Sequence, residues 1–259
     1  MVSVVLPVLN EEEELVPCVL SVVGQAGVEE VLVVDDGSTD RTPEVAGMLA
    51  RVFPEKVRYM PAGPKPDGWE GPAWAVYRGA LFARSIWVLR IEADTRLKPG
   101  ALAQVELGGT LVSCAPEVRC VTFWERALLP LLRRIVLDYS GRFPTAWGKF
   151  MLLPRHLCLS ALEDPRVHGS YASDMRTAQV LGGGVFFDGT DVCSVRQYRS
   201  WQDIWDGWSR VFADVLELDR GRLLRLLAAF PVLLARYRHL GLVVVWAAIL
   251  NSYRRRAKR

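Results

Sequence analysis

The sequence predicts an α/β fold built on a doubly wound, mostly parallel sheet with helices on both faces. Three apolar runs of strand length support this prediction, at residues 2–9, 31–34 and 86–91. The second run is Val-Leu-Val-Val, and four consecutive aliphatic residues are typical of a strand buried on both faces of a parallel sheet. Helical patterns separate the runs, and this alternation favours right-handed crossovers between parallel strands.

Each strand of this first half is expected to lead into a helix. Asn10 is a good N-cap, and the glutamates at 11–14 would place negative charge in the first helical turn, where the helix dipole favours it. The apolar residues that follow at helical spacing complete the pattern. Further helices are expected at 41–53 and 73–84, with a short strand at 57–60 and a Pro/Gly-rich loop at 61–72.

From residue 109 the pattern is less regular, and elements of both kinds are expected. Strands are predicted at 111–113, 148–153, 185–187 and 192–195, and helices at 124–139, 171–181 and 201–218. We interpret residues 1–218 as one α/β domain and residues 219–259 as a separate apolar helical segment with a basic tail.

The composition favours a cytoplasmic protein that does not bind nucleic acid. The chain has 259 residues and a formal net charge of +3, which is too small to indicate a nucleic-acid partner. Its five cysteines are odd in number and scattered without metal-ligand spacing, as in a protein with reduced cysteines. Met1 leads directly into a strand pattern, so no signal peptide is expected.

The end of the chain is apolar and then basic. Two apolar stretches, at 223–235 and 240–250, are each shorter than the roughly 20 residues that a membrane-spanning helix needs. Five of the last six residues are Lys or Arg. We favour two helices lying in the membrane interface, on the inner face of the cell membrane, with the tail on anionic lipid. The alternative is that these helices complete the core or form a dimer interface.

Carboxylates follow two of the predicted strands. Asp35 and Asp36 end the second strand, and Glu92 and Asp94 follow the strand at 86–91. Because open α/β sheets bind ligands at the carboxyl ends of their strands, both groups are expected to face one crevice. A Glu-Ala-Asp pair suits a hard divalent ion such as Mg²⁺ or Mn²⁺ that keeps open positions for phosphate oxygens. The alternative for Asp94 is a turn residue.

Three segments together resemble the family 2 glycosyltransferases with the GT-A fold. They are Val-Val-Leu-Pro-Val-Leu-Asn-Glu-Glu at 4–12, Val-Val-Asp-Asp-Gly-Ser-Thr-Asp at 33–40 and Glu-Ala-Asp-Thr-Arg-Leu-Lys-Pro-Gly at 92–100. The resemblance covers residues 2–210. Further segments, at 68–75, 171–174 and 198–210, are similar to the branch that includes hopanoid-associated and carotenoid glycosyltransferases.

The resemblance implies a role for several individual residues. Asp36 would bond the nucleotide base, with uracil expected, and Asp94 would hold the metal on the diphosphate. Glu92 stands beside it, where Asp is usual in the family. Asp174 matches the general base of inverting members, whereas the alternative from the sequence alone is a helix cap. The remaining nucleotide-pocket residues are Pro7, Leu9 and Glu11.

These parts predict an inverting glycosyltransferase that moves a sugar from a nucleotide sugar, expected to be a UDP-sugar, to a hydroxyl of a lipid or polyisoprenoid acceptor. A bound Mn²⁺ or Mg²⁺ would assist departure of the diphosphate. One alternative is a sugar nucleotidyltransferase, which would need a basic, Gly-rich loop after the first strand; residues 10–14 are acidic instead. The other is a non-catalytic binding protein that keeps the fold. Its support is two departures from the family: Glu92 stands where Asp is usual, and Pro72 stands where many relatives carry Lys.

Overall fold

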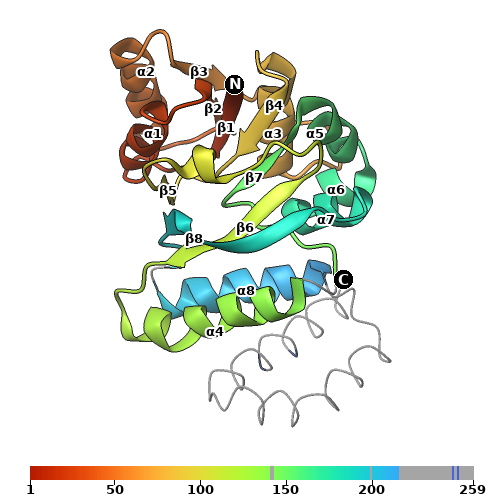
Figure 1. The fold of residues 1–259 in the computed structure, drawn as a ribbon. Helices are drawn as coiled ribbons and strands as arrows, with labels where there is room; N and C mark the ends of the chain where they lie inside the picture. The colour runs from red at the N-terminus through yellow and green to blue at the C-terminus, as the bar shows by residue number, and fades with distance from the viewer. Residues whose placement is uncertain (141–142, 199, 216–246, 248–249, 251–259) are drawn as a thin grey trace. The chain divides into compact units, whose positions relative to one another are not determined.

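The computed structural model describes residues 1–140, 143–198, 200–215, 247 and 250 (Figure 1). The chain divides into two compact units. The first comprises Met1–Arg119 and Val136–Arg196, and the second comprises Cys120–Ile135 and Gln197–Arg259. Every residue to which the resemblance gives a role belongs to the first unit.

The first unit is built on an eight-stranded sheet with the order β3-β2-β1-β4-β7-β6-β8-β5. Its strands are β1 (Val2–Val8), β2 (Val28–Asp35), β3 (Val57–Pro61), β4 (Trp87–Arg90), β5 (Thr95–Leu97), β6 (Val112–Val118), β7 (Met151–Pro154) and β8 (Val185–Val195). The half formed by β3, β2, β1 and β4 is parallel, as predicted. Beyond it the sheet is mixed, because β7 runs antiparallel to both β4 and β6 while β6 and β8 are parallel.

Helices cover both faces of this sheet, which confirms the predicted α/β architecture (Figure 1). Alternate strand residues point to opposite faces. Val4 and Val33 accordingly join a core under α1 and α2, whereas Val5 and Val34 join a core under α3, α5 and α7. The helices of this unit are α1 (Leu15–Val23), α2 (Thr42–Val52), α3 (Gly71–Phe82), α5 (Arg155–Leu162), α6 (Pro165–His168) and α7 (Ser173–Val180), with a 3₁₀ turn at Ala101–Gln104.

Asn10 does not cap the first helix, so that expectation was wrong. Helix α1 begins at Leu15 behind Glu14 and has no acidic residue in its first turn. Asn10 instead adopts a left-handed backbone with φ of 57°, which short polar side chains tolerate. Its Oδ1 accepts a hydrogen bond from the Thr39 amide at 2.8 Å, and its own amide donates to Ser38 Oγ at 2.9 Å. Asn10 therefore ties together the loops that follow β1 and β2.

The second unit contains α8 (Trp201–Val215) and the first part of α4 (Phe123–Ser140). The start of α4 is closed by a reciprocal capping box. Glu125 accepts hydrogen bonds from the Thr122 amide at 2.5 Å and the Val121 amide at 2.6 Å, and its own amide donates to Thr122 Oγ1 at 3.3 Å. Trp124 of α4 packs on Trp201 of α8, with ring centroids 5.0 Å apart.

The predicted apolar segment at 219–259 lies outside the described residues, apart from positions 247 and 250. The division into 1–218 and 219–259 therefore stays a prediction. Within the described part of the chain, no helix combines the length and the hydropathy that crossing a membrane requires.

Candidate active site

Strand pairing brings a basic segment beside the acidic segment at one edge of the sheet. β4 ends at Arg90, and Glu92 and Asp94 follow it. β7 runs antiparallel to β4, with Met151 paired to Arg90. Lys149 precedes Met151 by two positions, so the antiparallel pairing places it next to the residues that follow β4.

The ammonium of Lys149 bridges the two carboxylates, which we call the acidic pair, Glu92 and Asp94. Its Nζ lies 2.8 and 3.0 Å from the two carboxylate oxygens of Asp94 and also contacts the carboxylate of Glu92. The side chain of Lys149 is 10% exposed, against 17% for Asp94 and 36% for Glu92. This is a half-buried ion triad that opens to solvent on its Glu92 side.

Burial and neighbouring charges both shift the pKa values of the three groups in this triad. Burial opposes ionisation of Glu92, but Lys149 and Arg90 outweigh it and lower the pKa of Glu92. Burial is the larger influence on Asp94 and raises its pKa, with Glu92 adding to the shift and Lys149 opposing it. Burial would lower the pKa of Lys149, yet the two carboxylates raise it, so the lysine stays charged.

Asp174 lies beside Gly148, close to the acidic pair. Its Oδ2 accepts a hydrogen bond from the Gly148 amide at 2.7 Å, and its Oδ1 accepts one from the Met175 amide at 2.8 Å. A Cβ at Gly148 would stand 2.7 Å from Glu92 Oε1 and 3.3 Å from Asp174 Oδ2. Burial raises the pKa of Asp174, with Glu92 adding and Arg90 opposing. A residue without a side chain lets both carboxylates approach at this point without displacement.

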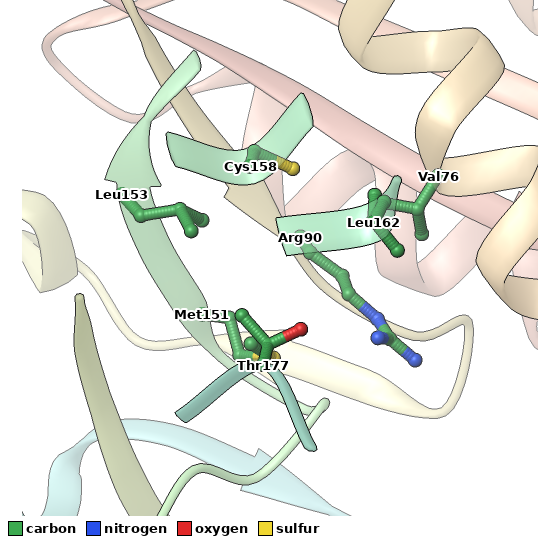
Figure 2. Close-up of a pocket in the computed structure, with 7 residues that line it drawn as sticks. All are labelled: Val76, Arg90, Met151, Leu153, Cys158, Leu162 and Thr177. Atoms are coloured by element: carbon green, nitrogen blue, oxygen red, sulfur yellow. The ribbon is translucent and has the colours of Figure 1, made fainter. Parts of the chain in front are cut away.

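Arg90 holds a fixed positive charge between these groups. Its Nη1 donates to Ser173 Oγ at 3.0 Å, and its Nη2 lies 3.8 Å from Glu92 Oε1. The side chain borders a cavity of about 10 Å³, shown in Figure 2, which is otherwise lined by Val76, Met151, Leu153, Cys158, Leu162 and Thr177. Such a volume suits one water molecule and no substrate. The mostly apolar lining strengthens the field of Arg90 at the acidic pair.

Glu11 is the residue of the predicted nucleotide pocket that lies in the field of the acidic pair. Burial raises its pKa to about 7, and Asp94 adds to this shift while Lys149 opposes it. Pro7 is half-buried near the end of β1, and Leu9, just beyond it, is 51% exposed. All three therefore stand near or after the carboxyl end of β1, and their part in a nucleotide pocket stays a prediction.

The two aspartates at the end of β2 have different environments. Asp35 is buried and serves the turn, since its carboxylate accepts hydrogen bonds from the Ser38 amide at 2.9 Å and the Tyr59 hydroxyl at 3.1 Å. Asp36 lies against the start of α3, where a Cβ on Gly71 would stand 1.8 Å from its Oδ2. Burial raises the pKa of Asp36, and Lys65 opposes this. Asp36 is thus the half-exposed member, which keeps it available for a ligand.

Three residues of this arrangement did not emerge from the sequence: Arg90, Gly148 and Lys149. Arg90 and Lys149 are charged residues inside stretches predicted to be strands, and such a charge is itself a signal of a functional or paired site. Nothing in the sequence, however, indicates that their strands are neighbours.

The acidic pair has the donor chemistry that a hard divalent cation requires. No cluster of three or more His, Cys, Asp or Glu side chains in the described part of the chain is arranged to hold a metal. The Lys149 ammonium nevertheless shows that these carboxylates already bind a cation, and their oxygens suit Mg²⁺ or Mn²⁺. The pair fits a divalent ion, provided that other ligands complete its coordination and Lys149 gives way.

Comparison with known proteins relates the N-terminal part of the chain to an enzyme family. Residues 3–105 match the model of glycosyl transferase family 2. A stretch of 97 residues is 36% identical to 4,4'-diaponeurosporenoate glycosyltransferase from Staphylococcus haemolyticus. That stretch is 37% of this chain and 24% of the relative, so the match spans about a quarter of the relative's length.

Solved structures share the fold at low sequence identity. The mannosyltransferase PcManGT from Pyrobaculum calidifontis, in complex with GDP-Man and Mn²⁺, has a TM-score of 0.63 at 19% identity, over 99% of this chain and 75% of its own. Glucosyl-3-phosphoglycerate synthase from Mycobacterium tuberculosis, in complex with Mn²⁺ and UDP-glucose, has a TM-score of 0.55 at 20% identity, over 85% and 81% of the two chains. Residues 3–105 thus match glycosyl transferase family 2, and the chain has the GT-A fold of these solved glycosyltransferases.

Proposed function

We propose that this chain is an inverting glycosyltransferase that moves a sugar from a UDP-sugar to a hydroxyl of a lipid-like acceptor. The observation that carries the proposal is the pair of acidic groups around Gly148. Glu92 and Asp94 form one group and Asp174 forms the other, and Arg90 lies between them. Glu92 and Asp94 can hold the cation that neutralises the departing diphosphate, while Asp174 can accept the proton of the attacking hydroxyl.

On the donor side, Asp94 and Glu92 would hold a divalent ion, Mn²⁺ or Mg²⁺. When bound, this ion supplies positive charge against the negative charge that develops on the diphosphate as the bond to the sugar breaks. The solved structures of the mannosyltransferase and the synthase contain Mn²⁺ with their sugar nucleotides, which supports the proposal. Asp36, Pro7, Leu9 and Glu11 would receive the nucleoside at the ends of β1 and β2.

On the acceptor side, Asp174 would take the proton of the attacking hydroxyl. Burial raises the pKa of Asp174, which makes its carboxylate a stronger base than that of an ordinary aspartate. The amides of Gly148 and Met175 hold the carboxylate in one orientation. Attack from the side opposite the diphosphate inverts the anomeric carbon and needs no covalent intermediate.

The direct test is turnover with purified protein. We expect UDP-sugars to raise the melting temperature in the presence of Mn²⁺, and transfer to release UDP. Formation of UTP and a sugar 1-phosphate from the UDP-sugar and added pyrophosphate would point instead to a nucleotidyltransferase. Binding without turnover on any hydroxyl acceptor would favour a non-catalytic binding protein. Preference for GDP-sugars over UDP-sugars would overturn the nucleotide assignment alone.

Changing Gly148 to Ala should reduce transfer strongly without unfolding the chain. The new Cβ would displace the Glu92 carboxylate, because it would stand 2.7 Å from Glu92 Oε1. A displacement of about 1 Å in a catalytic group can cost on the order of 10²-fold in rate. Gly24→Ala is the matched control, since its φ is −84° and its Cβ would meet nothing within 4 Å. Equal steady-state rates of transfer in both variants would show that this spacing is unimportant.

The acceptor and the location at the membrane rest on the C-terminal sequence and on the carotenoid-modifying relative. We propose that residues 219–259 hold the protein peripherally on the inner face of the cell membrane, where an apolar acceptor resides. Each basic residue near an anionic surface contributes about 1 kcal/mol. The five basic residues at 254–259 would therefore add substantially to apolar insertion.

Truncation after Leu218 should release the protein from anionic liposomes. Sedimentation with phosphatidylserine-containing vesicles measures this, with neutral vesicles as the control. The truncated chain should keep its affinity for UDP-sugar and lose activity on lipid acceptors. A full-length chain that stays in the supernatant at low salt would instead make this segment a core or dimer element.

A further inference from the structure

We propose that Lys149 is an internal counter-cation that keeps divalent metal off the acidic pair until a nucleotide diphosphate arrives. The ammonium would then pass to the diphosphate, which would leave Asp94 free to hold the metal. This proposal rests on the proposed function for the identity of the diphosphate. Its first part, the competition between Lys149 and metal, concerns the free protein alone.

The geometry of Lys149 is that of a competitor for metal. Its Nζ lies 2.8 and 3.0 Å from both oxygens of Asp94 and contacts Glu92 as well. A divalent ion would need the same oxygens, since carboxylates are the hard ligands available there. The lysine side chain is 10% exposed, so the ammonium is largely withdrawn from water and depends on these two partners.

The two cations next to the acidic pair, Arg90 and Lys149, differ in how easily they can move away from it. The guanidinium of Arg90 donates a hydrogen bond to Ser173 Oγ at 3.0 Å and lies 3.8 Å from Glu92 Oε1, so it is held by a partner outside the acidic pair. Lysine has a flexible four-carbon stem and a compact ammonium that rotates between partners. When Lys149 turns away, Glu92 therefore keeps a positive neighbour while Asp94 loses its own. Asp94 is the carboxylate left open for metal.

A diphosphate supplies what this exchange needs. Its oxygens carry negative charge that accepts the ammonium, and they add ligands that complete the coordination of a divalent ion. Metal and nucleotide would consequently favour each other's binding, and Lys149 would set how strongly. The chemical class of the ligand that recruits Lys149 is thus a nucleoside diphosphate or its sugar ester.

Lys149→Gln should raise the affinity of the nucleotide-free protein for Mn²⁺ by roughly 10- to 100-fold, because one positive charge a few ångströms from the binding oxygens is removed. The loss of the free Mn²⁺ signal in electron paramagnetic resonance measures this binding without any turnover. Lys149→Arg keeps the charge and should bind Mn²⁺ as weakly as the wild type. Lys98→Gln, which removes a lysine paired with Glu117 at 2.7 Å, is the matched control and should change nothing.

If Lys149→Gln does not fold, a second pair of variants tests the same competition. In a Glu92→Gln background, removing Lys149 leaves one carboxylate unpaired and not two. The doubly substituted protein should still bind Mn²⁺ more tightly than Glu92→Gln alone. Unchanged or weaker Mn²⁺ binding on loss of Lys149 in both backgrounds would overturn the proposal.

UDP distinguishes this inference from the proposed function. Adding UDP should tighten Mn²⁺ binding to the wild type by at least about tenfold, a coupling of ordinary size, and should do so less in Lys149→Gln. An equal effect of UDP in both proteins would overturn the transfer of the ammonium to the diphosphate. If UDP does not bind at all, the proposed donor is wrong, whereas the Mn²⁺ titrations of the free protein still decide the role of Lys149.

Discussion

Replacing Asp174 by asparagine is expected to remove sugar transfer while nucleotide binding persists. The amide cannot take a proton from the acceptor, so we expect a loss in kcat on the order of 10²- to 10⁴-fold. Its oxygen can still accept from the Gly148 or the Met175 amide, which now bind the two carboxylate oxygens at 2.7 and 2.8 Å. The fold should therefore survive. Single-turnover transfer and calorimetric titration with UDP measure the two effects separately.

Asp164→Asn provides the matched control for this variant. Asp164 caps α6 and accepts a hydrogen bond from the Arg166 amide at 2.8 Å, but its other partner is the exposed Arg166 side chain. We expect this substitution to leave transfer close to the wild-type rate. If Asp174→Asn instead retained transfer and lost nucleotide affinity, Asp174 would belong to the donor side of the site.

Replacing Asp94 by asparagine is expected to abolish metal-dependent binding of the UDP-sugar. The substitution removes an anionic ligand, so the drop in Mn²⁺ affinity should exceed the roughly 10- to 100-fold that loss of an outer hydrogen-bond partner of a metal ligand costs. Calorimetric titration of UDP-sugar with and without Mn²⁺ would reveal the loss as equal affinities under the two conditions. An affinity that Mn²⁺ still enhances as in the wild type would refute this role.

Glu92→Gln should have a smaller effect than Asp94→Asn, although the two side chains share Lys149. The Glu92 side chain is 36% exposed against 17% for Asp94, and it keeps Arg90 as a second charged neighbour. Its negative charge is therefore more screened and less available to a metal. Equal losses in the two variants would make the carboxylates equivalent ligands.

The parallel half of the sheet could be predicted because its strands are recognisable from their own residues alone. Val31–Val34 is aliphatic throughout, and such a run specifies a strand buried on both faces whatever surrounds it. The carboxylates after β2 and β4 could then be placed by the rule that strand ends share one edge. Asn10 shows the limit of local reasoning, since its partners Ser38 and Thr39 lie almost thirty positions away.

The central cation of the site could not be predicted for the same reason. Lys149 meets Glu92 and Asp94 because β7 inserts antiparallel between β4 and β6, and this pairing joins segments 57 and 55 positions apart. Periodicity identifies a strand at this place without naming its neighbours. The segments around Asp36, Asp94 and Asp174 resemble a known family, and this resemblance gave those residues candidate roles. The parts that Arg90, Gly148 and Lys149 play could be recognised only from the three-dimensional structure.

The register of the short strand β7 against β4 determines whether the positive charge of Lys149 lies at the acidic pair. Leu152 belongs to the core under α1 and α2, whereas Met151 and Leu153 belong to the core under α3, α5 and α7. A slip of one residue against β4 would exchange these faces, and the same slip would carry Lys149 away from the acidic pair. The packing of three apolar side chains, Met151, Leu152 and Leu153, thus determines where the Lys149 ammonium lies. Core substitutions in β7 should accordingly be felt as changes in metal and nucleotide affinity.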